Sequence, residues 1–168
     1  MEVRPAVPGD AEAIARVHVA TWQAAYRGLL PDAFLDGLRW EDRLARWTAA
    51  LSTPGPTEGG AWVAVENGTE IRGFVEWGPA RDEDLGAAGN EVYAIYVAPT
   101  AWRSGVGAAL LGVVPTSRDA VLWVLAGNVR ALAFYRRHGF DLDGMARRRE
   151  IGGAEASERR MRRSGDDG

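Results

Sequence analysis

The segment from Glu91 to Leu111 limits the fold of this chain more narrowly than any other. It reads EVYAIYVAPTAWRSGVGAALL, so an apolar strand pattern stops at Pro99 and a glycine turn opens directly into a helical pattern. A turn of this kind gathers backbone N–H groups and the positive end of a helix dipole around one point. Glycine, which has no Cβ, also lets a bulky anion approach the backbone. The segment therefore predicts a strand–turn–helix unit that binds an anion at Gly105 and Gly107.

The glycine spacing alone does not identify the anion. A dinucleotide-binding G-x-G-x-x-G turn needs glycine or alanine at position 110, where this chain has Leu110. A nucleotide-triphosphate P-loop needs a lysine, and all 20 basic residues of this chain are arginine. The alternative is that the two glycines only allow a tight turn and bind no anion. A second motif is therefore needed to identify a ligand.

The 168 residues predict one domain of alternating strands and helices over 1–163, followed by a flexible tail over 164–168. A strand over 1–7 precedes a helix, and a turn near Pro31 leads to a second helix. Asn67-Gly68 is a strong hairpin signal between two further strands, and a last hairpin is expected around the letters IGG. The predicted order is β-α-α-β-β-β-α-β-α-β-β.

Composition argues against several kinds of protein. A net charge of -3 and a pI near 5.5 oppose a nucleic-acid surface, because such binding neutralises many phosphates. No apolar run is long enough for a membrane span, and the opening residues lack the apolar region of a secretory signal, so we expect a cytoplasmic protein. Without cysteine and with two histidines, we expect no metal centre.

A second motif follows in LWVLAGNVRALAFYRRHGF, where a strand pattern runs into a helix that begins at Asn128. Asn128, Leu132 and Tyr135 share one face of this helix at positions i, i+4 and i+7. About 10 Å separates the first from the last along the axis, enough to flank one extended ligand. The alternative is that Asn128 is a simple N-cap and Tyr135 a core tyrosine.

Together, YAIYVAPTAWRSGVGAALL and LWVLAGNVRALAFYRRHGF resemble the two cofactor-binding motifs of the GNAT superfamily of N-acetyltransferases. The opening residues 3–32 are similar to the first strand and two helices of a bacterial branch of that family, so the resemblance covers nearly the whole chain. It implies a mixed α/β fold with a mostly antiparallel central sheet of about seven strands and four helices. It also implies acetyl-CoA as co-substrate, an amine acceptor and, at family level, a homodimer.

In that family the glycine turn holds the pyrophosphate of acetyl-CoA through backbone amides. The usual signature has Gln or Arg where this chain has Trp102, so Arg103 is expected to supply the charge. The helix that follows ends before Pro115 and is shorter than is common in the family. The residues to which the phosphate-binding role carries over are Trp102, Arg103, Ser104, Gly105, Val106, Gly107 and Ala108.

The resemblance further implies that pantetheine lies beside the strand that ends with Tyr96 and Val97, where it diverges from the strand at Leu122. The thioester oxygen would lie near a backbone N–H around Val97, in a small oxyanion-type site. Asn128 would bind the pantetheine arm, and Tyr135 would meet the sulfur.

Acetyl transfer needs a neutral amine, yet the pKa of a simple alkyl amine is about 10.4. Glu91 is our candidate for the general base, with Glu76 on the neighbouring strand or a water path as alternatives. Tyr135 is the candidate proton donor to the departing thiolate, whose conjugate acid has a pKa of about 8.5. Direct attack of the amine needs no covalent intermediate.

The acceptor, a primary amine of a small molecule or peptide, is expected between the first two helices. Trp22, Tyr26 and Phe34 would form its apolar walls, and Glu76 is a further candidate contact. A catalytically silent CoA-binding module with a regulatory or partner-binding role is the alternative, since it would keep the same fold.

Overall fold

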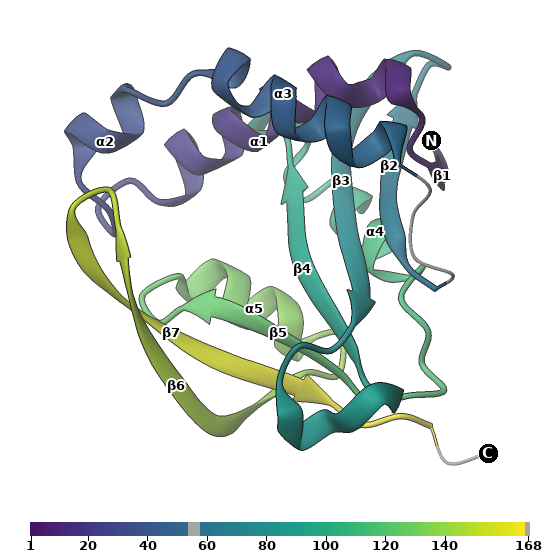
Figure 1. The fold of residues 1–168 in the computed structure, drawn as a ribbon, viewed down its shortest axis with the longest axis vertical. Coiled ribbons are helices and arrows are strands. Elements are labelled where there is room, and N and C mark those ends of the chain that lie inside the picture. The colour runs from purple at the N-terminus through teal and green to yellow at the C-terminus, as the bar shows by residue number, and fades with distance from the viewer. Residues whose placement is uncertain (54–57, 167–168) are drawn as a thin grey trace.

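A computed structural model describes residues 1–53 and 58–166, and the strands of this part form a seven-stranded sheet (Figure 1). All neighbouring strands are antiparallel except β4 and β5, so the predicted mixed and mostly antiparallel fold is confirmed. In sheet order the strands are β1 (Glu2–Pro5), β2 (Gly60–Glu66), β3 (Glu70–Pro79), β4 (Asn90–Val97), β5 (Ala120–Leu125), β7 (Ala154–Arg163) and β6 (Asp141–Ile151).

The helices follow the predicted order, with one addition. Where a turn was predicted near Pro31, the chain forms a short helix, because the fixed φ of proline suits a helix start and Gly37 ends the helix after one turn. The described helices are α1 (Ala11–Ala25), α2 (Asp32–Asp36), α3 (Trp40–Ser52), α4 (Val106–Leu111) and α5 (Val129–Arg136). Within the described residues, none of them is long and apolar enough to cross a membrane.

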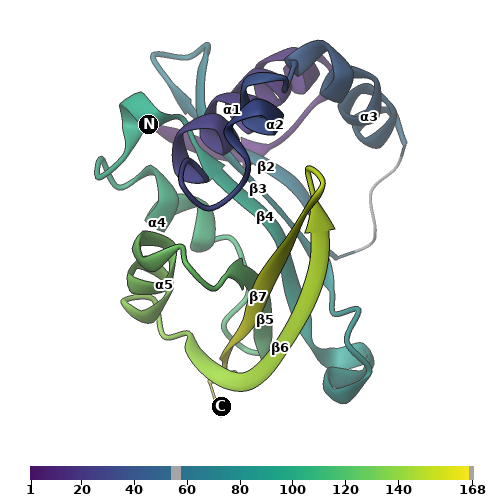
Figure 2. The ribbon, with the colours of Figure 1, turned by 90° about the vertical axis from the view of Figure 1, so that its left-hand side faces the viewer.

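Alternating side chains of the sheet build a core on each face. Phe74 of β3 packs with Ile14 of α1 and Trp47 of α3 on one face. The next residue, Val75, packs on the opposite face with Leu110 of α4. The helices consequently lie in two layers, α1 and α3 on one side of β2–β4 and α4 with α5 on the other (Figure 2).

Both predicted hairpins are present. Asn67 and Gly68 have φ angles of 51° and 79°, and Gly152 and Gly153 have φ angles of 62° and 77°. Two successive positive φ angles are typical of the tight turns that match the twist of paired strands. The second turn forms the tip of the β6–β7 hairpin, where the β-carbon of any other residue at Gly152 would lie 2.2 Å from Phe34 Cγ.

The sheet opens between β4 and β5, the one parallel pair among the described strands. Their pairing runs from Asn90 opposite Ala120 to Val92 opposite Leu122 and then stops. Beyond this point β4 continues along β3 and β5 continues along β7, so the two halves of the sheet diverge (Figure 1). A bulge at Tyr93 of β4 lies where the divergence begins, and bulges bend the strand that carries them.

The hydrogen-bond register of β4 decides which of its backbone groups face the divergence. Ala98 N donates to Arg72 O at 2.8 Å, so alternate residues of β4 exchange hydrogen bonds with β3. The N–H and C=O groups of Ile95 and Val97 lie between them and point away from β3. The end of β4 therefore offers backbone groups to a ligand on the side that β5 leaves.

The chain after β7 is described as far as residue 166. Gly165 N donates to Asp119 Oδ1 and Asp166 N donates to Thr116 O, both at 2.8 Å. The flexible tail predicted for 164–168 stays a prediction, and residues 167 and 168 lie outside the described residues.

His18 of α1 is buried on the α1–α3 side of the sheet, between α1, α3 and the strands β3 and β4. Trp47 Nε1 donates to His18 Nδ1 at 3.4 Å, which leaves the proton of the neutral ring on Nε2. Burial is the main cause that lowers the pKa of His18 to about 4, and the charges of Arg43 and Arg46 contribute in the same direction. Four aromatic rings surround it at centroid distances of 5.0 to 6.3 Å: Trp22, Trp47, Phe74 and Tyr96.

We predict that this histidine makes folding pH-dependent. Between a pKa of about 6.5 in the unfolded chain and about 4 in the folded chain, only the unfolded chain binds the proton. The free energy of unfolding should therefore fall by about 2 kcal/mol between pH 7 and pH 5, measured by urea titration. His18→Asn, which keeps an acceptor near Trp47, should remove this slope, and His138→Asn should retain it. An unchanged slope in His18→Asn would assign the effect to other groups.

Candidate functional site

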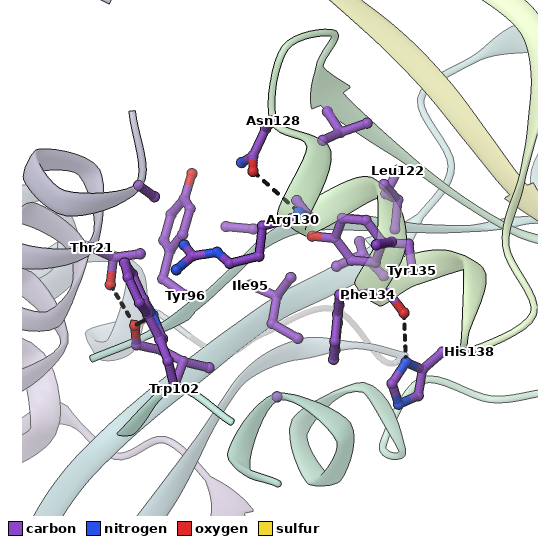
Figure 3. Close-up of a pocket in the computed structure, with 18 of the residues that line it drawn as sticks. Thr21, Ile95, Tyr96, Trp102, Leu122, Asn128, Arg130, Phe134, Tyr135 and His138 are labelled. Atoms are coloured by element: carbon purple, nitrogen blue, oxygen red, sulfur yellow. Dashed lines mark hydrogen bonds between the residues drawn. The ribbon is translucent and has the colours of Figure 1, made fainter. Parts of the chain in front are cut away.

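The divergence of β4 and β5 holds a cavity of about 690 Å³, lined by both strands, the glycine turn and α5 (Figure 3). Two predicted residues lie outside its lining: Ser104 Oγ donates to Ala101 O at 2.6 Å, and Val106 is buried in the core. The predicted cofactor-binding residues that the cavity brings together are Tyr96, Val97, Trp102, Arg103, Gly105, Gly107, Ala108, Asn128 and Tyr135.

The glycine turn has the backbone geometry that its sequence predicts. Arg103 and Gly105 have φ angles of 64° and 88°, in the left-handed region where glycine carries no steric penalty. Gly107 is needed for space instead, because a β-carbon there would lie 3.2 Å from the ring of Phe134. The first helical hydrogen bond runs from Ala109 N to Gly105 O, so the preceding N–H groups, at 106–108, have no acceptor within the helix.

Trp102 connects the turn to both sides of the cavity. Its indole N–H donates to Val97 O at 2.8 Å, and Thr21 Oγ1 of α1 donates to the same oxygen at 3.0 Å. The guanidinium of Arg130 lies 3.3 Å from the centroid of the Trp102 ring (Figure 3). Trp102 therefore braces the end of β4 and holds a cation of α5 beside the glycine turn.

The charged groups that line this cavity are all basic. These groups are the guanidinium groups of Arg103, Arg130 and Arg137, and the lining contains no carboxylate in the described part of the chain. Burial lowers the pKa of Arg130, and the nearby charge of Arg103 lowers it further. Two guanidinium groups that repel each other across one space are stabilised when an anion lies between them.

Among the lining residues that the sequence analysis did not predict, Arg130 and Thr21 have the clearest contacts. Arg130 lies two residues after Asn128, so a basic residue within the predicted motif was the available signal. Thr21 is the one hydroxyl residue among the buried residues of α1, and a buried polar side chain indicates a specific partner.

Asn128 and Tyr135 lie on one side of the cavity. Asn128 Oδ1 accepts from Ala131 N at 3.1 Å, so the residue is the N-cap of α5 while it also lines the cavity. The ring of Tyr135 packs against Phe134 and Phe140 at centroid distances of 5.3 and 6.1 Å, and its hydroxyl points into the cavity (Figure 3). Burial raises the pKa of Tyr135, and Tyr96 raises it further, so the hydroxyl stays protonated.

A second cavity of about 430 Å³ lies between α1, α3, β4 and the β6–β7 hairpin. Trp22, Tyr26 and Phe34, the predicted acceptor walls, all line it, whereas Glu76 does not. Tyr96 of β4 lines both cavities. A ligand in the first cavity and a ligand in the second can thus meet across β4.

The two carboxylates predicted as candidates for the general base differ in how many interactions they already make with arginines. Glu91 is 2% exposed, and its carboxylate accepts from Arg81 Nη2 at 2.6 Å, Arg81 Nε at 3.0 Å and Arg81 N at 3.1 Å. Glu91 in turn raises the pKa of Arg81. Glu76 pairs only with the exposed Arg46, at 3.2 Å. Glu91 lines the second cavity but already accepts three hydrogen bonds, so its role as base stays a prediction.

Comparisons with known proteins show the family of this chain. Residues 57–142, just over half of the chain, match the family described as "Acetyltransferase (GNAT) domain". Among curated proteins, the chain is similar to the uncharacterized N-acetyltransferase YuaI of Bacillus subtilis (strain 168), with 34% identity over 109 residues. The match covers 65% of this chain and 59% of that relative, which is less than two thirds of its length.

Solved structures share the fold at lower identity. PaiA N-acetyltransferase from Thermoplasma acidophilum, in complex with coenzyme A, has a TM-score of 0.70 at 18% identity and covers 97% of this chain and 98% of its own. The yncA protein from Salmonella typhimurium, determined with its cofactor acetyl-CoA, has a TM-score of 0.70 at 21% identity and covers 100% and 95%. With the family match, these findings show that this chain belongs to the GNAT family of acetyltransferases, the acyltransferase family that its two motifs predict.

Proposed function

We propose that this protein transfers the acetyl group of acetyl-CoA to a primary amine of a small molecule or peptide by direct attack. One observation carries the proposal: a basic cavity beside the glycine turn meets a second cavity across β4, with Tyr96 lining both. Two ligands that enter from opposite faces of the sheet would therefore contact each other at β4.

The basic end of the first cavity fits the pyrophosphate of acetyl-CoA. The free N–H groups at 106–108 and the guanidinium groups of Arg103 and Arg130 are donors that suit phosphate oxygens. The space beside Gly105 is open to a ligand, because a β-carbon there would meet no atom of the protein within 4 Å. Glycine is required at this position only by the positive φ angle. This donor set supports Arg103, and adds Arg130, as the source of charge that the usual signature places at Trp102.

The end of β4 fits the pantetheine arm and the thioester. Val97 O is already taken by Thr21 and Trp102, so Val97 N–H is the group left to donate toward the cavity. A thioester oxygen there would gain a fixed donor as negative charge develops on it. Asn128, which lines the same cavity, has a side-chain amide that can donate to the arm while its oxygen caps α5.

Acetyl-CoA supplies an activated acyl group, and the residues of this chain handle the protons. Tyr135 presents a protonated hydroxyl in the first cavity, where it can donate to the departing thiolate. Glu91, Glu76 or a water path takes the proton of the amine. The raised pKa of Tyr135 keeps its hydroxyl protonated, so the proton is present when the thiolate forms.

Binding and turnover test the proposal separately. Acetyl-CoA at about 100 times its Kd should stabilise the protein by about 2.7 kcal/mol, seen as a rise in Tm, whereas NAD and ATP should not. Release of CoA thiol in the presence of a panel of amines and peptides should then show transfer. Stabilisation by acetyl-CoA without thiol release from any amine would support the silent CoA-binding module instead.

Tyr135→Phe should lower kcat by roughly 10²-fold and leave the Kd for acetyl-CoA nearly unchanged, because the hydroxyl acts on the leaving group. Thiol release measures the first quantity and calorimetry the second. Tyr93→Phe is the matched control, since the Tyr93 hydroxyl donates to Pro79 O, at 2.6 Å. Equal kcat values for the two variants would remove Tyr135 from the mechanism.

Trp102→Leu and Arg130→Gln should each raise the Kd for acetyl-CoA by about tenfold, because the indole holds the guanidinium at the phosphate end. The double variant should be little weaker than either single variant, since the two side chains act together. S-acetylpantetheine, which lacks the pyrophosphate, is the control ligand, and Arg130→Gln should bind it like the parent protein through the arm. Additive losses, or equal losses for both ligands, would contradict this role.

A further inference from the structure

We propose that the acceptor is a small primary amine that also carries an oxyanion such as a carboxylate, and that Arg43 binds this oxyanion. The inference rests on the proposed acetyl transfer and specifies the class of its acceptor. It starts from the charges around the second cavity, which lies on the α1–α3 side of β4.

Basic groups outnumber acidic groups in the lining of this cavity. Five arginines face three glutamates, which leaves an excess of two positive charges. A bare alkylammonium ion is repelled by such a surface, whereas a molecule that carries both an ammonium and an oxyanion can present the oxyanion to it. The charged lining residues are Arg43, Arg46, Arg81, Arg147, Arg149, Glu91, Glu150 and Glu158.

Most of these arginines already have carboxylate partners. Arg81 is held by Glu91 through its backbone and side chain. Arg147 and Arg149 both approach Glu158, at 2.6 and 3.7 Å.

Arg46 pairs with Glu76 at 3.2 Å, and Glu76 lies outside the lining. Arg43 of α3 forms no ion pair with any carboxylate of the described residues, although it is partly buried. It is therefore the cation of this cavity that can accept an anionic ligand without breaking an existing pair.

The surroundings of Arg43 support an anion at this position. Arg43 and Arg46 both act on buried His18, so their charges reach into the wall of the cavity rather than only into solvent.

The same charges favour the reaction. A positive potential disfavours the ammonium form and lowers the pKa of an amine, so less work is left to the general base. A cavity of about 430 Å³ is at the small end of ligand sites, which suits an amino acid or a similar aminocarboxylate. In this arrangement the oxyanion lies at Arg43 and the amine lies toward Tyr96, where the two cavities meet.

Paired acceptors test the inference, each pair differing only in one charge. The probes are L-alanine, L-methionine, L-phenylalanine and β-alanine, each against its carboxamide, together with spermidine, butylamine and short peptides. With acetyl-CoA saturating, the acids should have values of kcat/KM about tenfold or more above those of their amides. Arg43→Gln should raise KM for the acids, so that the ratio of kcat/KM between acid and amide falls to about one. Arg43→Lys should restore part of this ratio.

Arg39→Gln removes the same charge from the residue just before α3, where Arg39 is exposed and pairs with Glu41, and should keep the ratio. Equal use of acids and amides, or an unchanged ratio in Arg43→Gln, would overturn the inference. Turnover of neutral or cationic amines alone would also overturn it while the proposed acetyl transfer stands. No thiol release from any acceptor, with acetyl-CoA shown to bind, would overturn both.

Discussion

The short parallel pairing of β4 with β5 is the constraint on which the site depends. If the two strands stayed paired along their full length, the backbone groups of Ile95 and Val97 would bond to β5 and the first cavity would not exist. Pairing stops after Val92, and the bulge at Tyr93 bends β4 at the same place. The open sheet is then stabilised elsewhere, since β5 pairs with β7 along its length and β4 pairs with β3.

Features set by neighbouring residues were predictable from the sequence. The turn at Asn67-Gly68, the N-cap at Asn128 and the left-handed Gly105 each follow from conformational preferences of one or two residues. The order of strands and helices was also predictable, because the apolar periodicity that indicates each element lies within one continuous segment. The exception was α2, because a five-residue helix is too short to show a period.

Features set by partners distant in sequence were not predictable. Glu91 and Glu76 look equivalent as acidic residues on adjacent strands, yet a loop brings Arg81 onto the first and leaves the second with one exposed arginine. The stacking of Arg130 on Trp102 joins two motifs that are separate in the chain. The unusual Trp102 of the glycine turn is thus explained by its contact with Arg130, which belongs to the other motif.

One carbonyl oxygen, that of Val97, receives a hydrogen bond from the first helix and another from the residue before the glycine turn. Thr21 belongs to the helix that also carries Trp22 of the second cavity, and Trp102 belongs to the turn beside the first cavity. The helix beside the second cavity and the turn beside the first cavity are therefore both hydrogen-bonded to a single atom at the end of β4. We therefore expect a shift of this strand end to carry Thr21 and Trp102 with it, so that the spacing between the two cavities changes little.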